Sequence, residues 1–463
     1  MTLIKSISGI RGTIGGKPGN GLTPVDIVEC TAAYAQIVRE NDVPDRIVVG
    51  RDGRMTGELV NALVVSTLMS MGLDVIDIGL STTPTVEMAV KKMNAGAGII
   101  LTASHNPKEW NALKFLDQNG DFISEATGKK VLEYIKVSRA VFAKLEDIGN
   151  YEMNNEMIDY HIGRILKLDY VQIEKIQKKK FKIVVDCINS TGAISVLPLL
   201  VKFGCEVIAI NEHITGNFAH NPEPLPEHLI DLSEKVIENK ADMGIVVDPD
   251  VDRLAFVCGD GTMFGEEYTL VAAADFILGK KSGNTVSNLS SSRALKDITE
   301  KHGGIYFPSK VGEVNVVEKM KAVGAVIGGE GNGGVILPDL HFGRDALAGI
   351  ALVLSLLAEK NISLKELKKT YPEYVISKNK ISIPQNIAPD RILEMIVAKY
   401  THEQINTEDG LKIDFADGWV QLRKSNTEPI LRVYSESKSK DRANALAKML
   451  IDDVGKLIAD SKL

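Results

Sequence analysis

Apolar runs rich in valine and isoleucine alternate with longer stretches of helical period over most of this 463-residue chain. The first set reads strand, helix, strand, helix, strand, over residues 46–50, 57–72, 73–79, 84–93 and 97–101. Such alternation is typical of a parallel sheet that helices cover on both faces. The rhythm restarts at 181–190 and again at 266–280, so we predict three similar α/β domains with mixed sheets.

The pattern changes after residues 367–374. Short alternating strands within 378–384 and 418–437 then surround helices near 390–400 and 441–459, which is typical of a smaller α+β domain. A charge-rich segment from about 140 to 180 is expected to be a helical linker between the first two domains. We therefore expect four domains, over 1–150, 151–258, 259–372 and 373–463, with a functional site in the central cleft.

Composition narrows the classes of partner. The formal charge of −7 and the pI near 5.8 give no reason to expect nucleic acid. An acidic chain that binds an anionic small molecule needs a locally basic site or a metal ion. No apolar run approaches the roughly 18 residues of a membrane span, so no membrane partner is expected.

The N-terminal segment and the cysteines favour a cytoplasmic protein. The first twelve residues, MTLIKSISGIRG, lack the continuous apolar stretch of a signal peptide. The four cysteines show neither a CxxC pair nor zinc spacing. Because all four lie in apolar surroundings, we expect buried free thiols in a reducing compartment, at Cys30, Cys187, Cys205 and Cys258.

Three aspartates at a spacing of two end the apolar run in GIVVDPDVDRLAFV, residues 244–257. Alternate residues of an extended turn point the same way, so Asp248, Asp250 and Asp252 can converge on one hard cation. Three carboxylates without nearby cysteine or histidine favour Mg²⁺ over Zn²⁺. A solvated acidic turn is the alternative, whereas a calcium EF-hand lacks its central glycine and closing glutamate. Arg253 follows directly and can hold a phosphate beside the metal.

An apolar run also stops abruptly at TASHNP, residues 102–107. The Asn106–Pro107 pair is enough to end a strand. Ser104, His105 and the downstream Lys114 exceed what a turn needs. They are therefore candidates for chemistry.

Two further loops carry groups that suit a sugar phosphate. In residues 421–437, Arg423, Lys424 and Arg432 flank the small-hydroxyl turn 425–427, a combination that suits a phosphate. A polar hairpin with exposed arginines is the alternative. In GGEGNGG, residues 328–334, glycines permit close approach of a ligand, and Glu330 and Asn332 offer an acceptor and an amide.

Two arginines near the N-terminus have weaker signals. Arg11 lies between glycines in SGIRG, a position that by itself predicts nothing. Arg51 and Asp52 follow an apolar run at VGRDG, and we interpret them as an ion pair that closes the turn.

Together these groups satisfy the requirements of phosphoryl transfer, which needs a carrier, a cation, an acid/base and a site for the phosphate that does not react. Ser104 is the candidate carrier, the three aspartates hold the metal, and the 423–432 loop holds the distal phosphate. Lys114 can act as a base only if its pKa is lowered, which we expect from burial or from nearby cations. Because these groups come from different domains, the last domain is expected to close the site.

Four ordered motifs, TASHNP, DPDVDR, GEGNGG and RKSNTEPILR, resemble the α-D-phosphohexomutase superfamily, and specifically its archaeal-like branch. These enzymes have four domains and move a phosphoryl group between O1 and O6 of a hexose. The resemblance covers essentially the whole chain. It implies that Ser104 is phosphorylated in the active enzyme and binds Mg²⁺ together with Asp248, Asp250 and Asp252.

The resemblance also implies roles for the other residues. Arg11 and Arg253 would support the phosphoserine, and Lys114 and His105 would belong to the acid/base group. Glu330 and Asn332 would bind sugar hydroxyls. The distal phosphate would be held by Arg423, Ser425, Asn426, Thr427 and Arg432.

The implied mechanism is a two-step relay through a bound bisphosphorylated sugar, with a hexose 1,6-bisphosphate as activator and one Mg²⁺ per chain. The expected partner is a sugar phosphate, and the chain is expected to be a monomer or a homodimer.

The motifs differ from those of two better-defined branches. Glucosamine-specific bacterial members usually carry serine in place of Asn332 and begin with TDGIRG, where this chain has ISGIRG. Members that act on mannose and glucose phosphates often have histidine near Glu313. We favour a phosphoglucosamine mutase. The alternatives are a phosphomannomutase/phosphoglucomutase and a non-catalytic sugar-phosphate-binding protein, although the latter would be expected to have lost Ser104 or an aspartate.

Overall fold

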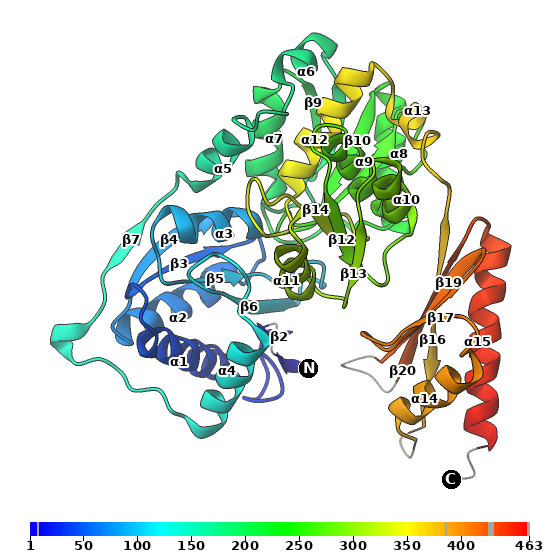
Figure 1. Ribbon diagram of the computed structural model, residues 1–463. Helices are drawn as coiled ribbons and strands as arrows, with labels where there is room; N and C mark the ends of the chain where they lie inside the picture. The colour runs from blue at the N-terminus through cyan, green and yellow to red at the C-terminus, as the bar shows by residue number, and fades with distance from the viewer. Residues whose placement is uncertain (7–8, 385–386, 425–429, 461–463) are drawn as a thin grey trace.

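The computed structural model describes the whole chain except residues 7–8, 385–386, 425–429 and 461–463. Three α/β units and a smaller C-terminal unit follow one another along the chain (Figure 1), which confirms the predicted fold class. We call them domains I to IV. The predicted boundaries between them remain predictions.

Domain I is built on a seven-stranded mixed sheet of order β1-β2-β6-β5-β3-β4-β7. Its strands are β1 (Leu3–Ser6), β2 (Gly9–Thr13), β3 (Arg46–Arg51), β4 (Asp74–Leu80), β5 (Ala97–Leu101), β6 (Trp110–Leu116) and β7 (Tyr151–Met153). Its helices are α1 (Pro24–Glu40), α2 (Gly57–Ser70), α3 (Thr83–Lys92) and α4 (Glu125–Val137). β3 is parallel to β4 and β5, as the alternation predicts, whereas β6 and β2 add antiparallel. β5 is buried along its whole length and delivers the 102–107 loop at its carboxyl end.

The segment predicted as a helical linker is helical only in part. A short 3₁₀ turn (Leu145–Asp147) comes first, and β7 then pairs parallel with β4 at the edge of the domain I sheet. Helices α5 (Met157–Ile165) and α6 (Ile173–Lys179) follow. The helical expectation was wrong for the first part because pairing with the sheet edge outweighs the weak local helical preference.

Domains II and III each carry a four-stranded sheet, of order β11-β10-β8-β9 and β13-β12-β14-β15. Domain II contains β8 (Lys182–Asp186), α7 (Gly192–Lys202), β9 (Glu206–Ile210), a 3₁₀ turn (Pro226–His228), α8 (Ile230–Glu238), β10 (Met243–Val247) and β11 (Leu254–Cys258). Domain III contains α9 (Glu266–Leu278), β12 (Asn284–Asn288), α10 (Ala294–Lys301), β13 (Tyr306–Ser309), α11 (Glu313–Val323), β14 (Ala325–Glu330), β15 (Gly334–Ile336), α12 (Ala346–Lys360) and α13 (Leu364–Lys368).

Domains II and III share one hydrophobic core. Phe203, which directly follows α7, Phe256 of β11 and Leu352 of α12 are all fully buried in the same cluster. The apolar helix α12 packs against α9 of its own domain and against α5, α6 and α7. Because separating the domains would expose this shared apolar surface, they form a common support for the metal loop and the glycine-rich loop.

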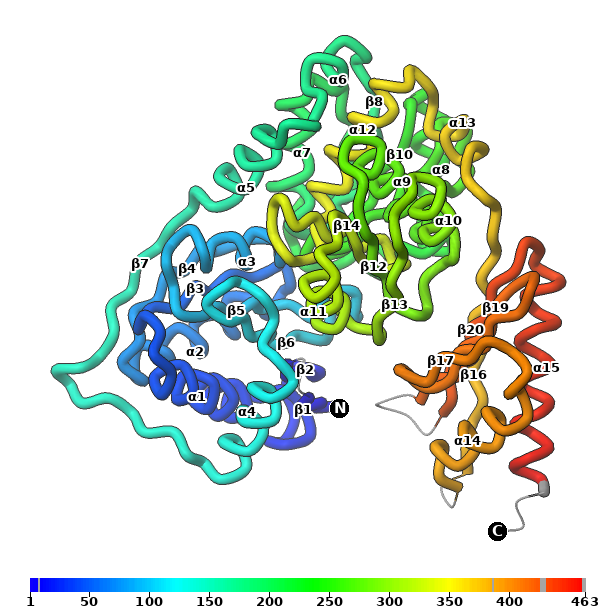
Figure 2. The backbone as a smooth tube through the Cα atoms, in the orientation of Figure 1, coloured from blue at the N-terminus to red at the C-terminus, as the bar shows by residue number. Residues whose placement is uncertain are grey.

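Domain IV is an antiparallel sheet of order β16-β20-β19-β18-β17 with two helices. Its elements are β16 (Val375–Ser382), α14 (Pro389–Lys399), β17 (Gln404–Asn406), β18 (Leu411–Phe415), β19 (Gly418–Lys424), β20 (Ile430–Ser437) and α15 (Lys440–Asp460). It has its own core and lies beside domain III, apart from domain I (Figure 2).

The state of the cysteines and the search for membrane-spanning helices bear on what the composition led us to expect. Cys30, Cys187 and Cys258 are buried and Cys205 is partly exposed, and all four thiols are free. Among the described residues, no helix is both long and apolar enough to cross a membrane.

Candidate active site

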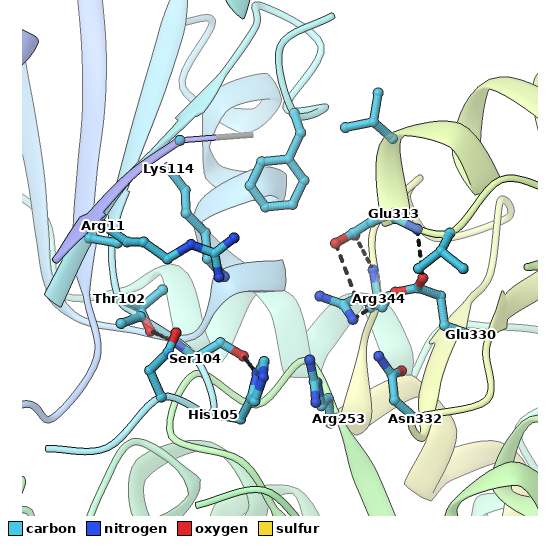
Figure 3. A pocket seen from close by; sticks show the side chains of 18 residues that line it. Arg11, Thr102, Ser104, His105, Lys114, Arg253, Glu313, Glu330, Asn332 and Arg344 are labelled. Atoms are coloured by element: carbon cyan, nitrogen blue, oxygen red, sulfur yellow. Dashed lines mark hydrogen bonds and ion pairs between the residues drawn. The ribbon is translucent and has the colours of Figure 1, made fainter. Parts of the chain in front are cut away.

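A cavity of about 290 Å³ lies where domains I, II and III meet. Side chains from all three domains line it (Figure 3). Domain I supplies Arg11, Ser104, His105 and Lys114, domain II supplies Arg253, and domain III supplies Glu313, Glu330, Asn332 and Arg344. Six other residues that the sequence predicts, from four separate motifs, therefore line the same cavity as Ser104. Glu313 and Arg344 line it as well.

Ser104 occupies a strained position just beyond the end of β5. Its φ is +48°, in the left-handed region that non-glycine residues rarely adopt. The amide N–H donates to Thr102 Oγ1 at 2.9 Å, and the hydroxyl Oγ donates to Asp248 Oδ2 at 2.8 Å. The conformation thus turns the hydroxyl toward the aspartate loop of another domain.

Arg54 supports this loop from the side away from the cavity. This arginine was not identified from the sequence. Its Nη2 donates to the carbonyl oxygens of Ser104 and Asn106 at 2.5 and 2.7 Å. Its Nη1 donates to the carbonyl oxygens of Pro107 and Trp110, both at 2.8 Å. With Nε on Asp52 Oδ2 at 3.1 Å, all five N–H groups of the buried guanidinium are used.

The interpretation of Arg51 and Asp52 as an ion pair was wrong. Asp52 Oδ1 accepts the backbone N–H of Arg54, two residues on, and this turn brings the Arg54 side chain to Oδ2. Arg51 instead pairs with Glu58 at 3.4 Å on the surface. The spacing Asp-x-Arg in RDGR is the signal that would have favoured Arg54.

The three aspartates converge in the turn between β10 and β11. Their carboxylate oxygens lie within 4.8 Å of one another, and all three side chains are fully buried. Val251, between them, has φ +61°, a strained value for a β-branched residue. The structure therefore forces together the carboxylates that the spacing predicts.

The free oxygens of this turn suit a hard cation. Asp250 Oδ2 accepts from Thr83 Oγ1 at 2.6 Å and from Lys114 Nζ at 3.0 Å, and Asp252 Oδ2 accepts from Arg344. Asp250 Oδ1 and Asp252 Oδ1 are buried without a hydrogen-bond partner. Burial and the neighbouring Asp252 and Asp250 carboxylates raise the pKa of Asp248 well above its ordinary value. The atoms available to bind a metal ion are all carboxylate or hydroxyl oxygens, so the residues fit Mg²⁺.

The side chains of a second group that could hold a metal lie close to one another. His161 Nε2 and His341 Nε2 lie 2.8 and 3.1 Å from Asp345 Oδ2. His341 Nδ1 lies 3.1 Å from Glu87 Oε2, and His161 Nδ1 lies 2.9 Å from Thr85 Oγ1. We call these five residues the histidine cluster. It joins α3 of domain I and α5 to domain III, so its evident role is to hold the domains together.

The expected lowering of the pKa of Lys114 is not found. Burial alone lowers it, but the carboxylates of Asp250 and Asp252 outweigh burial and raise the pKa above its ordinary value. His105 differs, because burial and the cations Arg253 and Arg344 lower the pKa of its imidazole to about 2. Its Nδ1 lies 3.4 Å from Ser104 Oγ. The site therefore places a charged ammonium and a neutral imidazole around the serine.

Arg344, also missed from sequence, joins the glycine-rich loop to the metal turn. Its Nη1 donates to Glu330 Oε2 at 2.9 Å, and its Nη2 donates to Asp252 Oδ2 at 2.6 Å. Its backbone N–H and Nε donate to the two carboxylate oxygens of Glu313 at 2.8 and 3.1 Å. It directly precedes Asp345, which caps α12 through the N–H of Ala348, and no local pattern marks the arginine itself.

The GEGNGG loop reaches this position through its glycines. Gly333 has φ +87°, and a Cβ there would lie 2.2 Å from the carbonyl oxygen of Leu254. Only glycine permits this close approach, which brings Glu330 and Asn332 to the cavity wall.

Comparisons with known proteins agree with this geometry. Residues 3–140, 159–261 and 265–374 match the models of phosphoglucomutase/phosphomannomutase α/β/α domains I, II and III, and residues 361–453 match the C-terminal domain of the same family. The chain is 34% identical to a probable phosphoglucosamine mutase from Methanopyrus kandleri, over 98% of both chains. The chain belongs to the phosphoglucomutase/phosphomannomutase family. The predicted resemblance to the α-D-phosphohexomutases is confirmed.

Other relatives of this phosphohexomutase carry different substrate names. A phosphoglucomutase/phosphomannomutase from Thermococcus kodakarensis is 35% identical and covers 93% of this chain and 95% of its own. A solved phosphoglucomutase/phosphomannomutase family protein from Burkholderia thailandensis superposes with a TM-score of 0.86 at 26% identity, over 99% of this chain and 98% of that one. The chain is thus an isomerase of the phosphohexomutase class.

Domain IV of the phosphohexomutase stands outside the cavity in this arrangement. It docks on domain III, where Arg293 Nη2 meets Asp414 at 3.0 Å and Lys412 Nζ donates to the Leu289 carbonyl at 2.8 Å. Arg423 and Arg432 are direct partners across β19 and β20, and both are partly exposed. Ser425, Asn426 and Thr427 lie outside the described residues. Of the described part of domain IV, nothing lines the cavity around Ser104.

Proposed function

We propose that this enzyme interconverts hexose 6-phosphate and hexose 1-phosphate, with glucosamine phosphate as its main substrate. The observation that carries the reaction is the 2.8 Å hydrogen bond from Ser104 Oγ to Asp248 Oδ2, beside a cavity lined by Arg11, Lys114 and Arg253. A nucleophilic oxygen, a cation site and three cationic side chains in one place are the requirements of phosphoryl transfer.

Ser104 is the proposed carrier. Phosphorylated Ser104 gives its phosphoryl group to the free hydroxyl of the sugar, so that the bond from phosphorus to Oγ breaks and a bond to the sugar oxygen forms. The bisphosphorylated sugar then reorients within the site and transfers its other phosphoryl group back to Oγ. An added hexose 1,6-bisphosphate would activate unphosphorylated enzyme by the same second step.

A Mg²⁺ ion bound by Asp248, Asp250, Asp252 and a Ser104 oxygen would supply electrostatic stabilisation of the charge that develops on the phosphoryl group. Arg253 and Arg11 support that charge from two domains. Lys114, charged in this site, would give a proton to the leaving Oγ of Ser104 and take up the proton that the sugar hydroxyl releases, so that its ammonium is restored. The imidazole of His105, with a pKa of about 2, stays neutral and would orient the Ser104 loop rather than accept a proton. Glu330 and Asn332 would orient the sugar, and the 423–432 segment of domain IV would hold the distal phosphate once that domain closes.

Intact mass tests the carrier. Protein as purified should contain a fraction about 80 Da heavier, the mass of one phosphoryl group. Ser104→Ala should lose that fraction and all turnover, whereas Ser70→Ala, an exposed serine on α2, should keep both. Unimpaired turnover in Ser104→Ala would contradict the proposal.

Several relatives are named probable phosphoglucosamine mutase, and these names support the choice of glucosamine phosphate. The name of the Thermococcus kodakarensis relative favours the second candidate, a phosphomannomutase/phosphoglucomutase. Turnover with glucosamine 6-phosphate, mannose 1-phosphate and glucose 1-phosphate separates the two. The first choice is wrong if the amino sugar is the poorest substrate by orders of magnitude.

A further inference from the structure

The cavity has two walls of opposite charge. Arg11 and Lys114 enter from domain I on one side, and the Glu313–Arg344–Glu330 network of domain III faces them (Figure 3). On the domain III wall, one guanidinium contacts three carboxylates, those of Asp252, Glu313 and Glu330, all within 3.1 Å. Asp252 belongs to the aspartate turn, so on the domain III wall itself two carboxylates, Glu313 and Glu330, share one guanidinium, and the remaining negative charge attracts a further cation.

Burial raises the pKa of Glu313 above its ordinary value, and the neighbouring guanidinium of Arg344 opposes that rise and favours the ionised carboxylate. Both oxygens of Glu313 accept from N–H groups of Arg344, and neither has a donor role in the network. A carboxylate in a bidentate pair with arginine is the favoured form of this arrangement.

Of the two glutamates that line the cavity, Glu313 has more acceptor capacity left. Glu330 Oε1 already accepts from Asn288 Nδ2 at 2.8 Å and from the Gly312 N–H at 3.0 Å, and its Oε2 accepts from Arg344. Each oxygen of Glu313 accepts one described hydrogen bond, so each keeps a lone pair for a ligand. Its side chain is almost buried but lines the cavity.

We propose that Glu313 is a specificity-determining residue that receives the ammonium group of an amino-sugar phosphate. This inference rests on the proposed function and deepens it. An amino-sugar phosphate carries an anion and a cation, and the two walls match these charges. A neutral hydroxyl at the same place would gain an ordinary hydrogen bond, whereas an ammonium gains a stronger, charge-assisted one. The difference corresponds to a preference of about tenfold.

Equilibrium binding to the Ser104→Ala protein tests this assignment without turnover. Glucosamine 6-phosphate should bind about tenfold more tightly than glucose 6-phosphate, and adding Glu313→Gln should abolish that preference. Glutamine keeps the size of the side chain, removes the charge and replaces one acceptor oxygen with an NH₂ donor. Glu318→Gln, an exposed position on the same helix, is the matched control and should leave the ratio unchanged.

The ratio of the two ligands separates specificity from structure, because a general distortion weakens both sugars alike. A preference that survives Glu313→Gln, or no preference in the Ser104→Ala protein, overturns the assignment. Failure of the proposed function has a different signature: the unmodified enzyme would then isomerise none of the hexose phosphates.

Discussion

The guanidinium of Arg54 donates from Nη2 to the carbonyl oxygen of Ser104 at 2.5 Å, although the two residues lie 50 positions apart. Three more carbonyl oxygens of the same loop accept from Arg54. The left-handed φ of Ser104 is therefore held by a side chain that does not reach the cavity. Arg54 is a positioning residue for the proposed phosphoryl carrier.

Replacement of Arg54 by methionine should lower kcat by at least about 100-fold, since a misplacement near 1 Å can cost that much. It also leaves the buried Asp52 unpaired, so the free energy of unfolding should fall by about 3–5 kcal/mol. Turnover and thermal unfolding measure the two effects. Arg51→Met, three residues away in a surface pair, should change each only slightly. Near-normal kcat in a folded Arg54→Met enzyme would contradict the positioning role.

Asp252→Asn should weaken Mg²⁺ binding by at least about 10–100-fold, the range found even for partners of metal ligands. The reason is that Asp252 Oδ1 is a buried carboxylate oxygen without a hydrogen-bond partner. Calorimetric titration with Mg²⁺ measures the change, and removal of the metal by a chelator should stop turnover reversibly. Asp260→Asn is the control, because that carboxylate is on the surface and pairs with Lys365. Equal affinity in Asp252→Asn and Asp260→Asn would exclude the aspartate turn as the site.

The histidine cluster should make stability depend on pH. Burial lowers the pKa of His341, but hydrogen bonds to Asp345 and Glu87 outweigh it and raise the pKa to about 10. A histidine whose pKa is raised in the folded state stabilises the fold. Its full contribution is present at pH values below the unfolded-state pKa near 6.5, and the contribution is lost as the pH rises toward 10. Burial also raises the pKa of Glu87 to about 8, and ionisation of a buried carboxylate acts in the same direction.

His341→Gln should therefore lower the melting temperature by at least about 4 °C near pH 6 and have little further effect near pH 10. Thermal unfolding of both proteins across this range measures the difference. His402→Gln, at an exposed histidine, serves as the control. A difference that is constant across the range would show that the side chain acts through packing alone.

Arg423→Met should raise KM for the sugar phosphate by about 10–100-fold, because a charge-assisted hydrogen bond to phosphate contributes about 1.5–3 kcal/mol. Arg423 and Arg432 are direct partners across β19 and β20, so the two strands present adjacent cations. Steady-state kinetics measures KM. Lys448→Met is the control, since that lysine is exposed on α15 of the same domain and lies outside the 423–432 segment. An unchanged KM in Arg423→Met would contradict the assignment.

Much of domain organisation follows from local patterns. Alternation of apolar strands with helices predicts the three α/β domains, and the strands at 46–50, 97–101 and 244–247 form where expected. The residues that follow these strands, among them Ser104 and the three aspartates, were recognisable because polar groups there end buried apolar runs. Such signals are local, so sequence alone suffices for them.

The amino-acid sequence by itself determined the strand ends, the spacing of Asp248, Asp250 and Asp252, and the family motifs. Only the tertiary structure decided that Arg54 supports Ser104, that Asp250 raises the pKa of Lys114, and that Arg344 shares its charge among three carboxylates. The contacts of Arg54 with Ser104, of Asp250 with Lys114 and of Arg344 with Asp252 join residues at least 50 positions apart, and those of Arg344 with Glu313 and Glu330 join separate elements of domain III. Their charges and hydrogen bonds depend on distances that no local pattern encodes, because folding alone brings the partners together.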